Sequence, residues 1–334
     1  MGENDVDAGV DWARWEQTGE GQVRLIENAS LGEFKLNQDG DDADSLPISI
    51  GFDDANGASV AAAELWRAGL RNRWGKIGPI ADHRSGEAIY GGILFRHFGH
   101  FLLESLARFW FISRHPDLPI VWHARDAILR NWQVSIFELL GVEPSRFHLV
   151  TRPTSVQRIL VPDPGLQIKG GMWSGHGNAL GRFLIGPTQG RRIWLSRSLL
   201  RPDARLRSNH IKIANEDILE AELVRRGWEI VHPQHLTLPL QLAALKGAEI
   251  IAGIEGSALH LLMLCGDIDA EVRIVSRNPK GKVADTYHHI AAAKRFRQSV
   301  VPKRAAELEL FDDERRFADV PKLAAVLDQS PVAR

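Results

Sequence analysis

The chain has 334 residues, 44% hydrophobic and 25% charged, so it can bury a core large enough for two domains. Lys plus Arg number 41 and Asp plus Glu number 42, and this balance gives no reason to expect nucleic acid as a partner. The single cysteine, Cys265, excludes an intrachain disulfide and suits a reducing compartment, and we expect it to be a small buried residue.

The apolar runs of the chain do not predict a membrane span. The first residues are acidic and lack the apolar region of a signal peptide. The longest apolar run, 259–264, is much shorter than the roughly 20 residues that cross a bilayer. We therefore expect a soluble, cytoplasmic protein and leave a peripheral membrane contact open.

The first half of the chain alternates between predicted helices and short strands. Residues 1–45 are polar and rich in Asp and Gly, which indicates a loose or edge-packed segment, and residues 58–72 have helical composition. Between residues 99 and 114 the apolar side chains share one side of a helix, whereas His100 and Glu104 lie on another. We expect further strands at 119–123, 147–150 and 156–162 and a helix at 128–141. This alternation predicts a mostly parallel sheet.

The second half follows a Gly- and Pro-rich stretch, 163–190, that suits an interdomain connection with a short helix near 176–185. Strands are predicted at 192–197, 228–232, 248–253 and 271–276, and helices at 215–227, 237–247 and 256–264. This series is typical of a Rossmann-like domain. The tail, 303–330, has a helical pattern.

We therefore predict an α/β protein with five parts. They are a polar N-terminal segment (1–45), an N-terminal α/β lobe (46–165), a linker (166–190), a C-terminal Rossmann-like lobe (191–302) and a helical tail (303–334).

One glycine-rich turn could carry chemistry. The segment Gly253-Ile-Glu-Gly-Ser-Ala-Leu-His260 follows an apolar strand and opens a helix, so its N–H groups could bind a phosphate. A tight turn without a ligand explains the same pattern. The segment is not G-x-G-x-x-G, which argues against a dinucleotide and hence against an α/β oxidoreductase or epimerase.

Other strand ends carry charged residues. Arg197, in Leu195-Ser-Arg197, could bind a diphosphate through its guanidinium fork, or it is simply a surface arginine. Asn215 and Glu216 suit an N-cap and a first-turn acid. A local basic patch is also possible, since arginines gather at positions 191, 192, 197, 201, 205 and 207.

His100 and Glu104 stand at i and i+4 of the predicted helix. A carboxylate beside an imidazole orients the ring and raises its basicity, so this pair could deprotonate an acceptor hydroxyl. A solvated pair worth a few tenths of a kcal/mol is the alternative.

Metal and serine-hydrolase signatures are weak. Asp42-Ala-Asp44 and Asp267-Ile-Asp269 could hold Mg²⁺ or Mn²⁺ against a diphosphate, but both suit plain loops. The histidines show no zinc-binding spacing, and no G-x-S-x-G elbow occurs.

Four blocks of sequence, taken in order, resemble glycosyltransferase family 61 over roughly residues 85–280. His100-Phe-Leu-Leu-Glu104 resembles the family's H-F/W-L-L-E helix, and Trp194-Leu-Ser-Arg197 with Asn215-Glu216 resembles its Y-I-S-R…N-E series. Residues 236–245 correspond to its S-x-x-E-Q-x-x-L helix, and residues 250–259 resemble its G-x-H-G-A/S-x-L turn.

The resemblance implies a GT-B-like fold of two facing Rossmann-like lobes with the active site in the cleft between them. It implies inverting transfer from a nucleotide sugar to a saccharide or glycoconjugate acceptor, usually without an obligatory metal. Bacterial members are associated with capsular or other surface polysaccharides, and eukaryotic members transfer GlcNAc or pentoses. We expect a UDP-sugar as donor and no metal site, and we make no prediction of the oligomeric state.

This chain departs from the family pattern at two positions. Glu255 stands where the family usually has His, and Leu240 replaces the Glu before Gln241. These changes leave open another donor, a changed role, or a non-catalytic nucleotide- or sugar-binding protein that retains the fold.

The expected site residues divide between the lobes. In the N-terminal, acceptor lobe we expect His100 assisted by Glu104, or Glu104 itself, to be the base, with His97, Asp82 and Glu255 in reserve. In the C-terminal, nucleotide-sugar lobe we expect Arg197 and the N–H groups from Gly256 to Leu259 to hold the phosphates. The full expected donor-binding set is Ser196, Arg197, Asn215, Glu216, Gln241, Glu255, Gly256, Ser257, Ala258 and Leu259.

Overall fold

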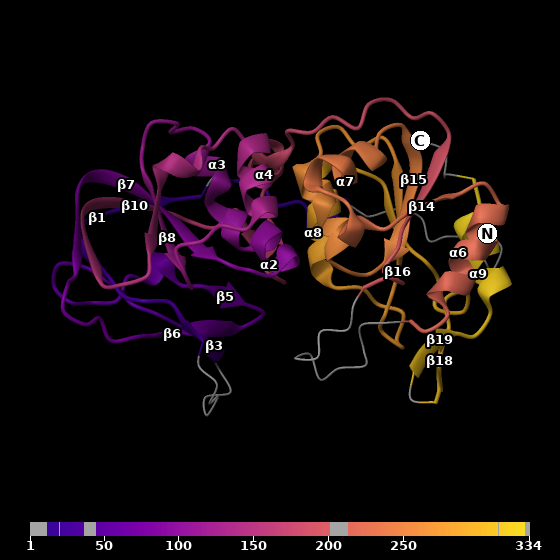
Figure 1. Cartoon of the computed structure of the whole chain (residues 1–334), viewed down its shortest axis with the longest axis horizontal. Coiled ribbons are helices and arrows are strands. Elements are labelled where there is room, and N and C mark those ends of the chain that lie inside the picture. The colour runs from indigo at the N-terminus through magenta and orange to yellow at the C-terminus, as the bar shows by residue number, and fades with distance from the viewer. Residues whose placement is uncertain (1–11, 20, 37–44, 201–212, 313, 331–334) are drawn as a thin grey trace. The chain divides into compact units, whose positions relative to one another are not determined.

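The chain folds into two compact units, each built from sheets and helices (Figure 1). The computed structural model describes residues 12–19, 21–36, 45–200, 213–312 and 314–330. The amino unit is Glu16–Arg182, and the carboxyl unit comprises the described residues from Phe183 onward together with helix α1 (Trp12–Trp15). The predicted α/β class is confirmed.

A six-stranded mixed sheet forms the centre of the amino unit, in the order β4-β1-β10-β7-β8-β9. Strands β10, β7, β8 and β9 run parallel, and β1 pairs antiparallel with β10 and β4. The bounds are β1 (Val23–Leu31), β4 (Phe52–Asp53), β7 (Asp82–Leu94), β8 (Ile120–Ala124), β9 (Phe147–Val150) and β10 (Thr154–Pro162).

Two smaller sheets and short helices complete this unit. The sheets are β2-β3-β6-β5 and β11-β12, with β2 (Lys35–Leu36), β3 (Ser45–Ile50), β5 (Trp66–Arg67), β6 (Leu70–Trp74), β11 (Leu166–Gln167) and β12 (Gly171–Met172). The helices are η1 (Ala61–Ala63), α2 (Phe98–Leu103), η2 (Ser105–Arg108), α3 (Phe109–Ile112), α4 (Asn131–Leu139), η3 (Pro144–Arg146) and α5 (Ser174–Leu180).

Buried polar side chains fix the segment that follows β7. Ser105 Oγ donates to the carbonyl of Ile93 at 2.7 Å and accepts the N–H of Phe95 at 2.9 Å. Arg108, which is also buried, donates to the carbonyls of Pro162 and Ala62. These bonds hold α2 and η2 against the end of the sheet.

The same bonds explain why one predicted helix is interrupted. Residues 99–114 form α2, η2 and α3 in succession, because Ser105 and Arg108 bond to the sheet instead of facing solvent. The helix predicted at 58–72 is wrong. A β5–β6 hairpin occupies its second half, and Ala68 and Gly69 have φ of 54° and 91° at its turn, a conformation that excludes a helix.

The carboxyl unit contains a five-stranded sheet, β14-β13-β15-β16-β17, in which every neighbouring pair is parallel. In chain order this is the 2-1-3-4-5 arrangement of doubly wound sheets. The strands are β13 (Arg191–Leu195), β14 (Glu229–Val231), β15 (Ala248–Ile254), β16 (Glu271–Val275) and β17 (Gln298–Val300).

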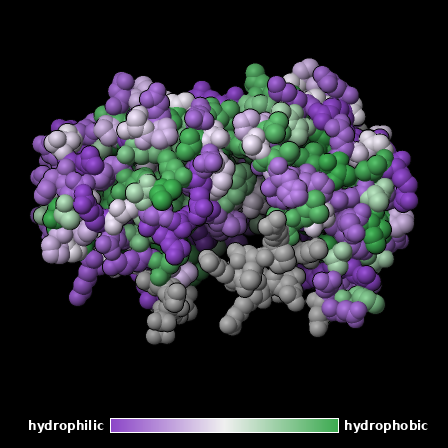
Figure 2. Space-filling view, in the orientation of Figure 1, coloured by the Kyte–Doolittle hydropathy of each residue, from purple (hydrophilic) through white to green (hydrophobic). Residues whose placement is uncertain are grey.

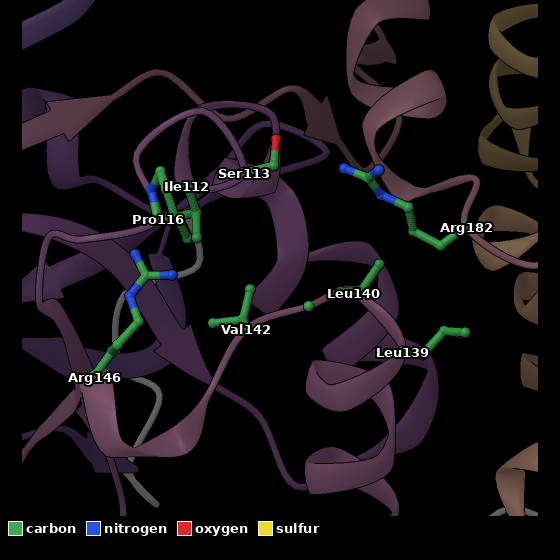
Figure 3. Close-up of a pocket in the computed structure, with 9 residues that line it drawn as sticks. Ile112, Ser113, Pro116, Leu139, Leu140, Val142, Arg146 and Arg182 are labelled. Atoms are coloured by element: carbon green, nitrogen blue, oxygen red, sulfur yellow. The ribbon is translucent and has the colours of Figure 1, made fainter.

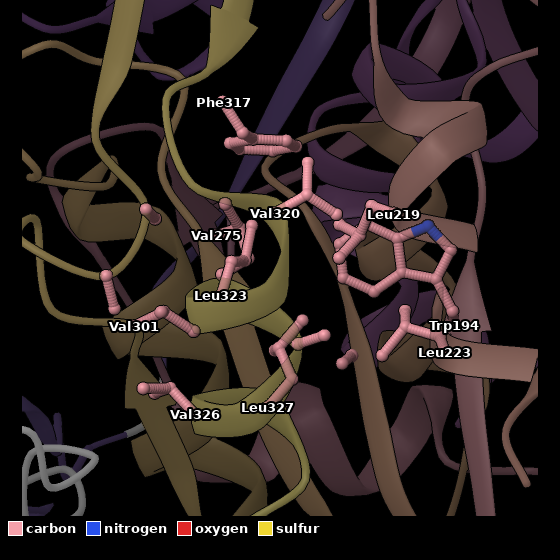
Figure 4. Close-up of a cluster of buried hydrophobic side chains, with 14 of the residues drawn as sticks. Trp194, Leu219, Leu223, Val275, Val301, Phe317, Val320, Leu323, Val326 and Leu327 are labelled. Carbon is pink, nitrogen blue, oxygen red and sulfur yellow. The ribbon is translucent and has the colours of Figure 1, made fainter. Parts of the chain in front are cut away.

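Helices pack around this sheet. They are α6 (Glu216–Arg225), η4 (Pro233–His235), α7 (Leu238–Ala244), η5 (Ser257–Leu264), α8 (Asp285–Lys294) and α9 (Val320–Leu327), and a hairpin of β18 (Leu308–Phe311) and β19 (Glu314–Phe317) precedes α9. Trp194 of β13 is fully buried among leucines of α6 and α9, so these two helices share one core with the sheet (Figure 4).

Some elements of this unit differ from the prediction. The 256–264 helix is 3₁₀, and α8 and β17 were not predicted. The tail is helical only in α9, which buried Arg273 anchors by donating to the carbonyls of Leu327 and Gln329. Helix α1 also belongs here: Trp15 stacks on His288 of α8 at 5.0 Å, within the segment that the sequence indicated to be loose or edge-packed.

The described part of the chain contains no helix that is long and apolar enough to cross a bilayer. On the face drawn in Figure 2, hydrophilic and hydrophobic side chains are intermixed over each unit.

Candidate functional site

In the carboxyl unit, most of the predicted donor-binding residues follow the ends of β13 and β15, and the others lie at α6 and in α7. The strand order reverses between these two neighbouring strands, because β14 lies on the other side of β13. Doubly wound sheets bind ligands at such a reversal, in the crevice outside the carboxyl ends of the strands. Arg197 follows β13 and Gly256 follows β15, so the fold brings both to that crevice.

Arg197 lies directly on the Gly253–Ser257 turn. Its Nη1 donates to the carbonyl of Glu255 at 3.3 Å. A Cβ added at Gly256 would lie only 1.6 Å from that same Nη1. The guanidinium therefore occupies the space that the missing side chain of Gly256 leaves, and the expected proximity of Arg197 to this turn is confirmed.

A second arginine, Arg277, lies near the first. It stands two residues after β16, as Arg197 stands two residues after β13. Burial lowers the pKa of Arg197, and the nearby charge of Arg277 lowers it further. Among the described residues, Arg277 Nε is buried without a hydrogen-bond partner. Arg277 was not among the predicted site residues, although a Ser-Arg pair follows both strands and was the available signal.

The turn also presents backbone N–H groups. Ser257 and Ala258 open η5, and their N–H groups donate to no backbone carbonyl in the described part of the chain. The N–H of Leu259, in contrast, donates to the carbonyl of Gly256 at 3.2 Å. The prediction that Leu259 offers its N–H to a phosphate is therefore wrong, because a 3₁₀ helix uses its third N–H internally.

Glu255, which replaces the family's usual His, has a structural bond. Its Oε1 accepts the N–H of Ala284, the N-cap residue of α8, at 3.0 Å. A carboxylate at this position suits the positive end of the helix dipole.

Glu216 and Ser196 support the loop that carries Arg197. Glu216 Oε1 accepts the N–H of Arg197 at 2.8 Å and the indole N–H of Trp194 at 3.2 Å. Burial raises the pKa of Glu216 to about 7. Ser196 donates its hydroxyl to Glu220 at 2.6 Å. These contacts orient Arg197.

Asn215 and Gln241 already have backbone partners. The amide of Asn215 bonds to both the N–H and the carbonyl of Phe317, and Gln241 Nε2 donates to the carbonyls of Pro233 and Leu236. A contact with ribose or base would compete with these bonds.

In the amino unit, His100, Glu104 and Arg67 form a connected network of hydrogen bonds. His100 Nδ1 lies 2.8 Å from Glu104 Oε2, and Arg67 donates to both Glu104 oxygens, at 2.8 and 2.6 Å. The Glu104 side chain is 3% exposed, whereas that of His100 is 36% exposed. The structure thus confirms the His100–Glu104 contact and adds Arg67, which β5 supplies.

This geometry distinguishes between the two proposed bases. Burial raises the pKa of Glu104, but hydrogen bonds from His100 and Arg67 and the charge of Arg67 outweigh it, so the pKa lies below its usual value. A buried, low-pKa carboxylate with both oxygens paired is a poor base. In the neutral tautomer whose Nδ1–H donates to Glu104, the lone pair of His100 Nε2 is left to accept a proton.

The reserve residues have other surroundings. His97 caps α2 by accepting the N–H of His100 at 3.4 Å. Asp82 opens β7, at the opposite end of the strand from α2, and lies 3.6 Å from His148.

A cavity of about 310 Å³ in the amino unit contains none of the expected residues (Figure 3). Its Arg146 donates to the carbonyls of His115 and Leu118 and so helps to hold the wall.

The remaining sequence predictions concern metal, cysteine and charge. Asp42-Ala-Asp44 and the arginines at 201, 205 and 207 lie outside the described residues. Within the described ranges no group of three or more acidic, His or Cys side chains could hold a metal. Asp267 and Asp269 therefore belong to no such group. Cys265 is buried as expected, and burial raises the pKa of its thiol to about 12.

Comparison with known proteins yields a family match. The family model of Glycosyltransferase 61 matches residues 98–268, just over half of the chain. No curated protein matches the sequence. The matched range begins at α2, which carries His100, and extends beyond η5. The chain belongs to glycosyltransferase family 61 and is therefore a glycosyltransferase.

Proposed function

We propose that the protein transfers a sugar, with inversion, from a nucleotide sugar to a hydroxyl of a saccharide or glycoconjugate acceptor in surface polysaccharide biosynthesis. The single observation that carries the proposal is the Arg197 guanidinium seated on Gly256 where the strand order reverses. A UDP-sugar is the donor that we expect.

In this proposal the carboxyl unit holds the diphosphate. Arg197, Arg277 and the N–H groups of Ser257 and Ala258 would bind its oxygens. Guanidinium groups form short, charge-assisted hydrogen bonds with phosphate. Negative charge grows on the departing diphosphate in the transition state, so donors fixed in a partly buried turn accelerate the departure. This arrangement needs no metal ion.

The amino unit would supply the base. The acceptor hydroxyl attacks the anomeric carbon as an oxocarbenium-like transition state forms, and His100 Nε2 takes its proton. Glu104 would orient the ring and stabilise the imidazolium. Arg67 would hold the carboxylate in place by its two bonds.

The proposal also assigns a role to each unit. We propose that they are the acceptor and donor lobes of a GT-B-like fold. The cytoplasmic location rests on the single cysteine and stays a prediction.

Nucleotide binding tests the proposal. A thermal-shift panel of UDP, GDP, CMP, CDP and NAD identifies the ligand, since a ligand that binds only the native state raises the melting temperature. Calorimetry with that ligand then compares Arg197→Gln with wild type. Loss of a charge-assisted contact worth about 1.5–3 kcal/mol should weaken binding at least about tenfold.

Arg191→Gln is the matched control, because Arg191 lies at the other end of β13 and pairs with Glu229. It should leave nucleotide affinity unchanged. A response to NAD alone would support a dinucleotide enzyme instead, and absence of any nucleotide response would contradict the proposal.

A further inference from the structure

Three arginines gather at the carboxyl ends of two neighbouring parallel strands of the amino unit. Arg96 follows β7, and Arg125 and Arg130 begin and end the loop between β8 and α4. We call these three residues the arginine group. The carboxyl edge of parallel strands is where α/β sheets bind ligands.

A buried glutamine holds these loops together. Gln133 is only 2% exposed; its Nε2 donates to the carbonyl of Phe95 at 3.1 Å, and its Oε1 accepts the N–H of Arg130 at 2.7 Å. Trp132 packs against Phe98 and Phe101, with ring centroids 5.3 and 5.0 Å apart. The two loops are therefore positioned by packing and backbone bonds rather than by their charges.

The arginine group carries an excess of positive charge. Asp126 pairs with Arg96, and it is the one carboxylate among the described residues that forms an ion pair with the group. Burial lowers the pKa of Arg96, and the charges of Arg130 and Arg125 lower it further, so both of these arginines repel the guanidinium of Arg96. An oxyanion placed among them would relieve this repulsion.

The segment that carries Arg96 also contacts the proposed base. The ring of Phe95, beside Arg96 in sequence, is 5.9 Å from the ring of His100 and 5.9 Å from the guanidinium carbon of Arg67. Helices α2 and α4, which follow the two loops, lie side by side in Figure 1, in agreement with the Trp132 contacts.

We propose that the arginine group binds an anionic group of the acceptor, a carboxylate or a phosphate, beside the hydroxyl that His100 deprotonates. This inference rests on the proposed transferase function. Guanidinium forks match the oxygens of both anions. An acidic sugar residue and a phosphate-linked carrier are two sources of the same chemistry.

Calorimetry with matched small ligands tests the inference. Methyl β-glucuronide supplies the carboxylate and glucose 1-phosphate the phosphate, and methyl β-glucoside is the neutral control. Saturating UDP is present so that the donor site is filled. The variant Arg125→Gln/Arg130→Gln removes two exposed guanidinium groups. The control Arg84→Gln/Arg158→Gln removes two exposed ones that pair with Asp82 and Glu87.

We expect at least one oxyanion to bind more tightly than the glucoside, and its affinity to fall about tenfold or more in Arg125→Gln/Arg130→Gln. The control variant should keep wild-type affinity. Tighter binding of methyl β-glucuronide would identify an acidic sugar residue as the source of the anion, and tighter binding of glucose 1-phosphate would identify a phosphate-linked carrier. Equal binding by the variant and wild type would overturn the inference.

A titration with UDP alone separates this inference from the proposed function. Suppose that UDP binds and that Arg197→Gln weakens this binding, but that Arg125→Gln/Arg130→Gln binds the oxyanions with wild-type affinity. In that case only the inference fails. If UDP affinity itself falls in Arg125→Gln/Arg130→Gln, the group contacts the donor and the inference is wrong. If UDP does not bind at all, the proposed donor fails, while the oxyanion titrations without UDP still decide the arginine group.

Discussion

Replacing Gly256 by Ala should weaken donor binding although no charged residue is substituted. The new Cβ would lie 1.6 Å from Arg197 Nη1 and 2.9 Å from its Cζ, both far inside van der Waals contact. Because these atoms end a flexible side chain, the guanidinium should move while the backbone stays. Gly256 has φ 172° and ψ 176°, an extended conformation that alanine adopts freely, so we expect little change in folding stability.

The size of the effect follows from what the displaced guanidinium contacts. If Arg197 binds the diphosphate by charge-assisted hydrogen bonds, its displacement should cost about 1.5–3 kcal/mol, or roughly 10- to 150-fold in Kd. Calorimetric titration with UDP measures this. Gly175→Ala is a suitable control, because a Cβ there meets no atom within 4 Å. The reasoning would be refuted if Gly256→Ala bound UDP like wild type while Arg197→Gln bound it weakly.

Four further outcomes follow from the same geometry. Arg277→Gln should weaken UDP binding about tenfold or more, as measured by calorimetry, because this guanidinium lies near Arg197. His100→Ala and Glu104→Gln should each lower turnover about 100-fold or more with donor affinity little changed, and near-wild-type kinetics in both would remove the assigned base. Chelation with EDTA should leave turnover intact, and loss that Mn²⁺ restores would refute metal-free transfer. The Glu216 carboxyl, with an ordinary pKa of 4.5, keeps its proton up to about pH 7 in the folded state. The free energy of unfolding of the wild type should therefore fall between pH 5 and pH 8. This decrease should be smaller in Glu216→Gln, by on the order of 2 kcal/mol, as measured by urea unfolding.

The parts of the fold predicted correctly are those whose signal is local. Strand β9 occupies the predicted residues 147–150, and the four strands from β13 to β16 follow from short apolar runs between turn residues. Strand β7 was missed because its first half is mostly exposed and its second half contains Gly91 and Gly92. A Cβ at Gly91 would meet the ring of Trp122 at 2.5 Å, so the reason for glycine there is tertiary packing.

The candidate site shows the same division. His100 and Glu104 were predictable because i and i+4 meet on a helix. Arg67 was not, because it is 37 residues from Glu104 in sequence and lies on a strand in a segment with helical composition. Arg197 and the Gly253–Ser257 turn were found from strand ends, which a parallel sheet brings to one edge.

The departure at Glu255 has a physical explanation that involves two neighbouring segments. A His at this position would offer a donor or a cation beside the phosphates, and Glu offers neither. The Glu255 carboxylate instead accepts the N–H of Ala284 at the start of α8, so it is held by the helix end. Arg277, which follows β16, places a guanidinium near Arg197, where a cation is required by the proposed mechanism. In the proposed mechanism, Arg277 after β16 supplies the cation that the family's His would supply from the turn.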